Sequence, residues 1–448
     1  MPLGKIRKKM NSAALILKEM GLDAETIAAC LLYGEIKNAP RDLSGLEQKH
    51  GKNILFLVEN ALKLDEIKYS GTKERAENLI KMFLVMAQDI RVVLIKLADR
   101  YREMHILDKL PEENRKRIAL ETLDIYAPIA NRFGIGELKG RLEDEAFKHL
   151  YPKEHKWLEK EVSVKYEARK NYVKKIEPII RDILKKENII PLEINARTKH
   201  FYSLYKKLER HQMDLEKIHD LVAARVIVKN INDCYLALGA INQAYKPLPE
   251  FINDYIAMPK PNGYQSLHTT VFGPDEKIIE IQIRTRQMHN RAENGIAAHW
   301  AYKERENKNS RAEANTRNTI WIEQLREWQK IIPGSDEFFE SFKIDIFKDR
   351  VFVLTPKGDV IDLPEGATPV DFAYQIHTDI GNRCAGVKIN GKIATLDAEL
   401  KSGDLVEILT QKNKKPSADW LNFVKTDIAK DRIKSAAKEK NKKLIFRT

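Results

Sequence analysis

Residues 278–284 read Ile-Ile-Glu-Ile-Gln-Ile-Arg, a stretch of strand length in which isoleucines alternate with polar residues. Because successive side chains of a β-strand point to opposite faces of the sheet, Glu280, Gln282 and Arg284 are predicted to share one face and the isoleucines the other. The isoleucine face suits a hydrophobic core, whereas an acid, an amide and a guanidinium side by side favour a functional site. Periodicity alone also allows an amphipathic sheet with one hydrated face.

A second run of strand length lies at residues 221–229, with Asp220 at its start and Arg225 within it. Carboxylates from two separate strands can hold one Mg²⁺, with water and phosphate oxygens completing its coordination shell. Asp220 and Glu280 are therefore candidate magnesium ligands.

Cationic side chains and a hydroxyl are concentrated just upstream of this strand, at Arg197, Lys199, His200, Ser203, Lys206 and Lys207. If they converge, they form a phosphate-binding cradle. The segment lacks the glycines of a Walker loop. A solvated helix face is the alternative interpretation.

The segment 260–268, Lys-Pro-Asn-Gly-Tyr-Gln-Ser-Leu-His, reads as a loop that leads into a strand. Tyr264 offers an aromatic face for a nucleobase, a contact that contributes about 1–3 kcal/mol per base. Lys260 and His268 can contact phosphates. The alternative is a Pro/Gly turn whose tyrosine packs inward.

The remainder of the chain divides into regions that differ in hydrophobic spacing and composition. Residues 1–155 carry apolar residues at three- and four-residue spacing, which predicts helices. A charged and exposed helix is expected over 151–189, and an α+β region over 190–305. Residues 307–318 read as a polar, mobile loop, and a tryptophan-bearing helix is expected at 319–332.

A third unit is predicted from about Asp349. It contains two strands around a Pro-Lys-Gly turn and one helix that runs from a Thr368 N-cap to near Gly381. A hairpin through Asn390-Gly391 and a last strand follow.

Composition excludes several classes of protein. The 448 residues are 43% hydrophobic and 32% charged, which is typical of folded domains and excludes a wholly disordered chain. No apolar run approaches the ~20 residues that span a bilayer, and no signal peptide is expected. Three scattered cysteines, Cys30, Cys234 and Cys384, favour a reducing cytoplasm and exclude a disulfide framework.

The net charge of +13 favours polyanionic partners such as RNA or nucleotides, although a solvated lysine face explains it equally well. Part of the excess lies in residues 430–448, which hold eight basic and two acidic residues.

The motifs together resemble the synthetase domain of the RelA/SpoT homologue (Rel) family, whose members make the alarmones ppGpp and pppGpp. The resemblance rests on ARTKHFYSLYKK (196–207), IHDLVAARVIV (218–228), DYIAMPKPNGYQSLHTTV (254–271), EIQIRT (280–285) and MHNRAENGIAAHW (288–300). In addition, TPKGDVIDLPEGATPVDFAYQIHTDIGNR (355–383) resembles the family's TGS domain.

The resemblance implies a multidomain fold. It consists of an all-α HD-like domain at 1–155, an α+β nucleotidyltransferase-like synthetase domain with a mixed sheet at 156–340, a small α+β TGS domain of the ubiquitin-like β-grasp type at 345–412, and the start of a helical regulatory domain at 413–448.

The implied activity is that of a GTP pyrophosphokinase of the stringent response, which transfers the β,γ-pyrophosphate of ATP to the 3′-hydroxyl of GDP or GTP. Asp220 and Glu280 are the implied catalytic and Mg²⁺-binding acids, Glu280 being either a metal ligand or the base. The implied ATP contacts are Arg197 and Arg225, which sandwich adenine, with Lys199, Ser203 and Lys207 on the phosphates. The implied GDP/GTP contacts are Lys260, Asn262, Tyr264, His268, Gln282 and Arg284.

The amino-terminal region departs from the family pattern. Segments 24–38 and 89–104 resemble the HD hydrolase domain, but where the family has His-Asp-x-x-Glu-Asp this chain has Tyr33, Gly34, Lys37 and Asn38 at the functional positions. Asp99 is the one acid retained, and Lys37 puts positive charge where the cation would lie. No Mn²⁺ is expected, and the hydrolase activity is expected to be lost.

Further implications concern partners. The histidine of the AYxIHT segment, His377, is the implied contact with the CCA end of uncharged tRNA on the ribosome. No membrane or DNA partner is expected. The loop 211–214, His-Gln-Met-Asp, matches neither family variant, so the preference for GDP or GTP stays open. For His289 and His299, structural roles are preferred to a zinc site. The alternative function is a catalytically silent regulator that binds tRNA or the ribosome.

Overall fold

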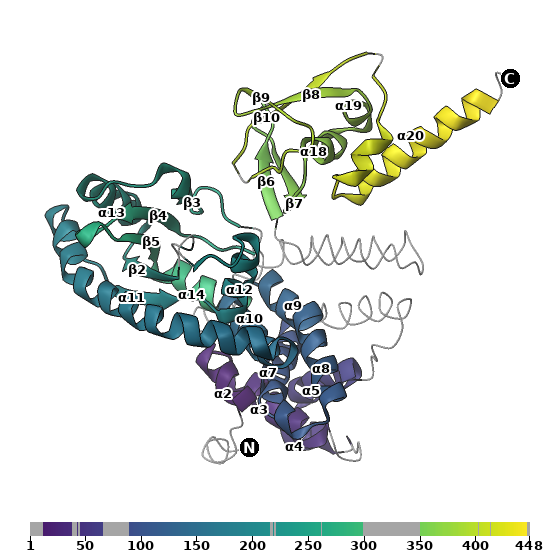
Figure 1. Cartoon of the computed structure of the whole chain (residues 1–448). Coiled ribbons are helices and arrows are strands. Elements are labelled where there is room, and N and C mark those ends of the chain that lie inside the picture. The colour runs from purple at the N-terminus through teal and green to yellow at the C-terminus, as the bar shows by residue number, and fades with distance from the viewer. Residues whose placement is uncertain are drawn as a thin grey trace. The chain divides into compact units, whose positions relative to one another are not determined.

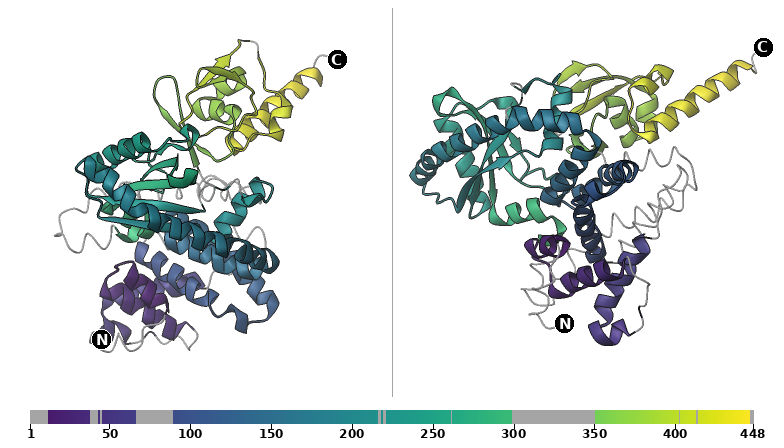
Figure 2. Two further views of the ribbon diagram at one scale, coloured as in Figure 1. Left: turned by 60° about the vertical axis from the view of Figure 1, so that its left-hand side comes forward. Right: turned by 60° about the horizontal axis from the view of Figure 1, so that its bottom comes forward.

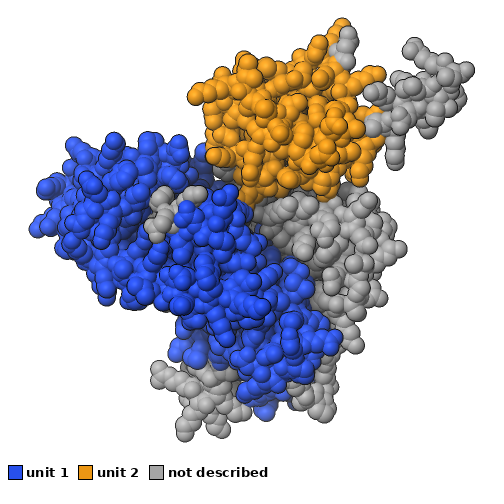
Figure 3. Space-filling view, viewed as in Figure 1, with its two compact units in different colours: residues 1–69, 77–331 blue, residues 70–76, 332–448 orange. Residues whose placement is uncertain are grey.

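The computed structural model describes residues 12–37, 43, 45–65, 89–215, 218, 221–260, 262–298, 350–401, 403–412 and 414–445. Asp220, Asn38, His299 and the segments 307–318 and 319–332 lie outside these residues. The described chain forms two compact units, 12–298 and 350–445, which are coloured separately in Figure 3. No helix of the described residues is both long enough and apolar enough to cross a bilayer.

The amino-terminal part of the first unit is all helical, as predicted (Figure 1). Its helices are α2 (Ser12–Glu19), α3 (Ala24–Ile36), α4 (Leu46–His50), α5 (Lys52–Asp65), α7 (Ile90–Met104), α8 (Glu112–Glu121), α9 (Ala127–Arg132) and α10 (Gly136–Leu150). A π-helical segment, Thr122–Tyr126, joins α8 to α9. Carboxylate N-caps start two of these helices, because Asp23 accepts from the amide of Thr26 and Asp89 from that of Arg91.

The helix α11 (Pro152–Lys186) was expected to be exposed, and that expectation is wrong for one of its faces. Leu158, Val162, Ile176 and Ile180 repeat at helical spacing and are fully or almost fully buried against the sheet. The lysines and glutamates between them occupy the opposite face. The helix runs alongside the sheet in the views of Figures 1 and 2.

The central domain is built on a mixed five-stranded sheet, as predicted, in the order β1-β2-β5-β4-β3. The strands are β1 (Glu193–Thr198), β2 (Val222–Val228), β3 (Asn253–Asp254), β4 (Leu267–Phe272) and β5 (Ile278–Thr285), with helices α12 (Phe201–Arg210), α13 (Ile231–Ala244) and α14 (Arg286–Asn294). Strands β2 and β5 are parallel and the other pairs antiparallel. The isoleucines of β5 share one core with side chains of α11 and α13.

The second unit contains the predicted strands and turn. Its elements are β6 (Arg350–Leu354), β7 (Val360–Pro364), α18 (Pro369–Ile376), α19 (Thr378–Asn382), β8 (Cys384–Ile389), β9 (Lys392–Ala394), β10 (Val406–Thr410) and α20 (Asp427–Ile445). Asn390 and Gly391 turn the β8–β9 hairpin with positive φ angles of 52° and 78°.

The single helix expected at 368–381 is instead two helices. Thr368 caps α18 through a capping box with Asp371, as predicted in part. His377 then adopts an extended conformation, and its ring accepts the amide of Asp379 to cap α19. The extended backbone of His377 ends α18, and the ring of the same residue caps α19.

Candidate functional site

The polar face of the sheet forms as the alternation predicts. The register pairs Gln282 with Arg225 on one side and with His268 on the other, which places these residues on the face that also carries Glu280 and Arg284. The face is less hydrated than a simple amphipathic sheet would be: Gln282 is 2% exposed and Arg284 is 1% exposed. Helix α14 packs against β2 and β5.

A hydrogen-bonded chain links three predicted site residues. The Tyr264 hydroxyl lies 2.8 Å from Nε2 of His268, and Nδ1 of His268 lies 2.8 Å from a carboxylate oxygen of Glu280. A neutral imidazole with its proton on Nδ1 satisfies both contacts, since it accepts from the tyrosine and donates to the carboxylate. Tyr255 packs edge-on against His268, with ring centroids 5.2 Å apart. The chain fixes the orientation of both Tyr264 and Glu280.

The loop before Tyr264 is folded back on itself. The amide of Gly263 donates to the carbonyl of Lys260, and the amide of Lys260 donates to the carbonyl of Tyr264. The Asn262 side chain accepts the amide of Tyr264 at 3.2 Å. Gly263 has a φ of +78°, which a side chain disfavours. The ammonium of Lys260 lies 4.7 Å from the centre of the Tyr255 ring, so the loop brings a cation beside two aromatic rings.

Buried guanidinium groups lie next to this loop. Arg225 approaches Glu293 of α14 at 3.3 Å, and Arg284 approaches the same carboxylate at 3.6 Å. Within the described part of the chain, Nε of both arginines and Nη2 of Arg284 have no hydrogen-bond acceptor. Burial and the neighbouring Arg284 lower the pKa of Arg225 to about 10. Two guanidinium groups that share one carboxylate can accept an additional anionic group.

His289 belongs to the same cluster. Its Nδ1 lies 3.7 Å from Glu293. Burial, and then Arg284 and Arg225, lower the pKa of His289 to about 4, so the ring is neutral near pH 7. Sequence reasoning missed Glu293, whose role depends on the packing of α14 over the sheet.

Apart from Arg225 on β2, the predicted ATP contacts follow one another on β1, on the turn after it and on α12. Arg197 is exposed on β1 opposite Ala223, and Lys199, Ser203 and Lys207 are half-buried. The Tyr166 hydroxyl donates to the carbonyl of Lys199 at 2.6 Å. The Ser203 hydroxyl lies 3.4 Å from Glu143 of α10. Carboxylates of α10, which the sequence did not single out, therefore support this turn.

The degenerate HD positions meet in a buried ion cluster. Lys37 contacts Asp99 at 2.8 Å and also Glu103, and Lys96 contacts Asp65 at 2.5 Å. The expectation that Asp99 is the one acid of this site is therefore wrong, because Asp65 and Glu103 converge with it.

Tyr33 occupies the middle of this cluster. Its hydroxyl donates to Asp65 and accepts from Lys96 at 2.8 Å. Burial, then Asp99 and Asp65, raise the pKa of Tyr33 above its ordinary value, so the phenol stays protonated. Burial would also raise the pKa of Asp99, but Lys37, Arg102 and Lys96 together lower it. The Asp99 carboxylate is therefore charged, and ammonium and guanidinium groups of the chain itself surround it.

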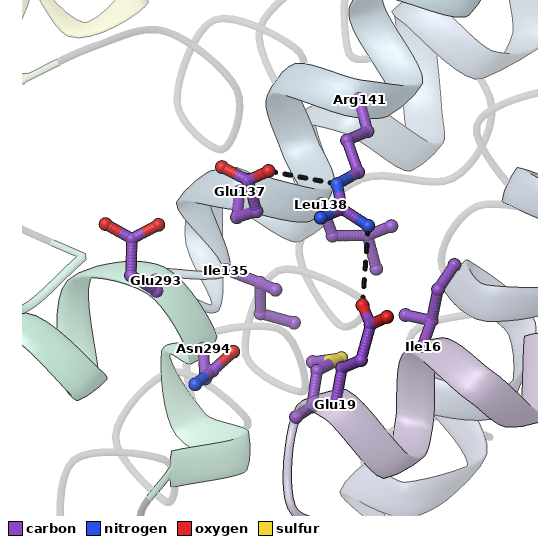
Figure 4. A pocket seen from close by; sticks show the side chains of 9 residues that line it. Ile16, Glu19, Ile135, Glu137, Leu138, Arg141, Glu293 and Asn294 are labelled. Atoms are coloured by element: carbon purple, nitrogen blue, oxygen red, sulfur yellow. Dashed lines mark hydrogen bonds and ion pairs between the residues drawn. The ribbon is translucent and has the colours of Figure 1, made fainter. Parts of the chain in front are cut away.

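A pocket of about 160 Å³ opens between the helical region and the central domain (Figure 4). Its lining comes from α2, the start of α10 and α14, and includes Glu19, Glu137, Arg141 and Glu293. Arg141 bonds to Glu137 at 2.9 Å and approaches Glu19 at 3.6 Å. This acidic lining does not suit a phosphate-bearing ligand.

The remaining predicted site residue, His377, is exposed in the second unit at the start of α19. Gly34 and Tyr33 follow one another in α3. Asp220 and Asn38 lie outside the described residues, so their roles stay predictions.

Three family models match the chain. The region found in RelA / SpoT proteins matches residues 196–307, an HD domain matches residues 5–136, and a TGS domain matches residues 351–410.

Similar proteins extend over nearly the whole chain. A GTP pyrophosphokinase of Myxococcus xanthus is 45% identical over 95% of this chain and 56% of its own length. The bifunctional (p)ppGpp synthase/hydrolase SpoT of Escherichia coli is 44% identical over 95% of this chain and 60% of its own length. The chain thus spans somewhat more than half of these relatives. The crystal structure of small alarmone synthetase 2 from Bacillus subtilis is 26% identical, covers 38% of this chain and 96% of its own, and has a TM-score of 0.27.

The ion cluster generates a prediction about stability. Lys37→Met leaves Asp99 and Glu103 without their shared cation, and removal of one partner from a buried pair costs about 3 kcal/mol. We expect that loss in urea unfolding at pH 7. The exposed Lys63 of α5 supplies the control, and Lys63→Met is expected to change stability by less than about 0.5 kcal/mol.

The same variant has a pH signature. Because the folded-state pKa of Asp99 lies below its ordinary value, its contribution is present above the unfolded carboxyl pKa of about 4 and is lost as pH falls. Burial would lower the pKa of Lys37, but Asp99 and Glu103 raise it, so its contribution is lost only at alkaline pH. The difference between wild type and Lys37→Met should therefore shrink in acid. A difference under about 1 kcal/mol at pH 7 would contradict the buried-pair account.

Proposed function

The chain belongs to the RelA/SpoT family, and on that premise we propose that it transfers the β,γ-pyrophosphate of ATP to the 3′-hydroxyl of GDP or GTP, which makes ppGpp or pppGpp. One observation carries the proposal: the hydrogen-bonded Tyr264–His268–Glu280 chain lies on the same sheet face as the buried Arg225 and Arg284. A stacking ring, a carboxylate and an anion-binding cluster are what such a transfer needs. The relative from Myxococcus xanthus carries the name of this activity.

The acceptor nucleotide is assigned to the Tyr264 side of the face. The guanine base would stack on Tyr264, whose ring is held by the bond from its hydroxyl to His268. Lys260 and Asn262 flank the ring through the folded loop, and Gln282 and Arg284 form the floor of the face. Restraining the ring before binding lowers the entropy cost of ordering the base.

ATP is assigned to the edge formed by β1, β2 and α12. Arg197 and Arg225 offer planar guanidinium groups to adenine, although Arg225 also faces Glu293. Lys199, Ser203 and Lys207 lie along the following turn and helix, where they would contact the phosphates.

Magnesium is the proposed cofactor, held by Asp220 and Glu280. The donor chemistry fits, because Mg²⁺ prefers carboxylate and phosphate oxygens and commonly takes one or two protein carboxylates. When bound, the ion neutralises charge on the transferring phosphates.

Pyrophosphoryl transfer depends on positioning and charge neutralisation more than on covalent chemistry. The 3′-oxygen forms a bond to the β-phosphorus while the bond from that phosphorus to the α,β-bridging oxygen breaks and AMP leaves. The protein contributes in-line placement of the 3′-hydroxyl, and guanidinium and ammonium groups stabilise the charge. Glu280 accepts the proton of the hydroxyl or serves the metal, and its bond from His268 fixes the carboxylate for either role.

We further propose that the helical region does not hydrolyse ppGpp and binds no Mn²⁺. A metal-activated water needs a cation held by neutral histidines and carboxylates. Here Lys37 and Lys96 pair with Asp65, Asp99 and Glu103, and Arg102 and Arg100 supply further positive charge to Asp99 and Glu103. A divalent ion would have to displace bonded ammonium groups. The relatives include bifunctional enzymes, so this loss is a property proposed for this chain and not for its family.

The ribosome and uncharged tRNA are the partners proposed for the second unit, and the cytoplasm is the proposed location. His377 is exposed where it could meet an RNA end, and residues 430–448 are strongly basic. The three cysteines are buried unpaired thiols, in keeping with a reducing compartment.

A silent regulator remains the competing function. It predicts no product from labelled ATP and GDP or GTP with Mg²⁺, even when tRNA and ribosomes are added. Synthesis predicts labelled ppGpp or pppGpp that accumulates and persists.

The two acids generate the first activity prediction. Asp220→Asn and Glu280→Gln are each expected to abolish synthesis, because they remove charge at nearly constant volume. Glu276, which is exposed on the turn between β4 and β5, supplies the control, and Glu276→Gln should retain full activity. A tenfold loss of rate corresponds to a barrier that is higher by about 1.4 kcal/mol. If a variant keeps more than about a tenth of the rate, the residue it replaces is neither the base nor a metal ligand.

The second activity prediction concerns Tyr264. Tyr264→Ala should weaken GDP binding by roughly 5- to 150-fold, since stacking contributes about 1–3 kcal/mol, and should leave ATP-analogue binding within twofold. Calorimetry with each nucleotide measures both. Equal losses would mean that Tyr264 shapes the whole cleft instead.

The third activity prediction concerns hydrolysis of ppGpp at the ion cluster. Purified protein incubated with labelled ppGpp and Mn²⁺ should release no pyrophosphate. Release at a rate that depends on Asp99, tested with Asp99→Ala, would falsify the loss of hydrolysis.

A further inference from the structure

The turn from β1 to α12 is tied to α10 through a histidine that the chemistry above leaves without a role. Nδ1 of His200 lies 2.8 Å from a carboxylate oxygen of Asp144, and its Nε2 lies 3.6 Å from Glu137. The side chain is 22% exposed. The imidazole therefore sits between two carboxylates of α10.

Asp144 performs a second task at the same place. Its other oxygen accepts the backbone amide of Tyr202 at 2.9 Å. His200 is the N-cap residue of α12, but its own side chain makes no capping bond. A helix leaves its first amides without intrahelical acceptors, and a carboxylate there also interacts favourably with the helix dipole. Asp144 thus caps α12 from a different helix.

The fit of the ring against α10 depends on Gly140. A Cβ at that position would overlap the His200 ring, so only glycine allows the ring to lie directly on the helix backbone. Gly140 is buried. The close contact between the His200 ring and α10 therefore requires glycine at position 140.

The electrostatics favour a charged ring. Burial lowers the pKa of His200, but the neighbouring carboxylates of Asp144 and Glu137 outweigh it and raise the pKa to about 9. Glu143 of α10 is also nearby and contacts Ser203. The imidazolium therefore balances the carboxylates that underlie the proposed phosphate-binding turn.

The ion pairs continue beyond α10. Glu137 is bonded by Arg141, which approaches Glu19 of α2, and Figure 4 shows both contacts. A continuous series of charged contacts therefore runs from Glu19 through Arg141, Glu137 and His200 to Asp144.

We propose that His200 is a positioning residue for ATP: held between Asp144 and Glu137, it fixes the turn that presents Lys199 and Ser203 to the triphosphate. The helical region is thereby an integral support of the ATP site, even without hydrolysis of its own. This inference rests on the proposed synthetase function. It assigns His200 no contact with the nucleotide.

The test compares His200→Ala, Asp144→Ala and Gly140→Ala with wild type in the full chain. Each variant should raise KM for ATP about tenfold, leave KM for GDP within twofold and reduce kcat less than KM changes. The pair His200→Ala/Asp144→Ala should lose no more than the worse single variant, because both remove the same restraint. The adjacent Glu145, which pairs with Lys148 on α10, provides the control, and Glu145→Gln should behave as wild type.

The outcomes separate this inference from the function on which it rests. Wild type that makes no alarmone refutes the synthetase, and that result precedes any variant. Active wild type with an unchanged KM for ATP in His200→Ala overturns the positioning role. Parallel losses for ATP and GDP, together with a lower melting temperature, also overturn it, because they show a general structural role. Gly140→Ala repeats the test with the histidine still present.

Discussion

The central domain depends on one constraint, the period-two alternation of β5. It buries the isoleucines against α11 and α13, and it forces Gln282 and Arg284 into the opposite, largely desolvated face. Buried polar groups are costly without partners. Glu293, His268 and Arg225 collect around that face, and the cluster still carries guanidinium donors without acceptors among the described residues. A face held together in this way is suited to an anionic ligand.

The helical region also buries charged groups, but these groups have partners of opposite charge. Its acids Asp65, Asp99 and Glu103 pair with cations of the same region, which are Lys37, Lys96, Arg100 and Arg102. These ion pairs connect the end of α3 with α5 and α7. On α10, Asp144 contacts the neighbouring turn through the His200 ring and the amide of Tyr202.

Sequence periodicity predicted the sheet face, the hairpin at Asn390-Gly391 and the Thr368 cap, because each of these is encoded by local spacing or turn chemistry. It could not predict Asp65, Asp144 or Glu293, whose roles arise only when distant helices pack together. It also misjudged α11, because the many charged residues of that helix obscured a buried stripe. The break at His377 was missed because the side chain caps the helix that follows it.

The most direct test of this account is a crystal structure of the protein with GDP, Mg²⁺ and a non-hydrolysable ATP analogue. Guanine is expected on the ring of Tyr264, phosphates near Arg284 and Lys199, and the metal at Asp220 and Glu280. Nucleotides bound away from the polar face of the sheet, or a base on any surface other than the Tyr264 ring, would contradict it.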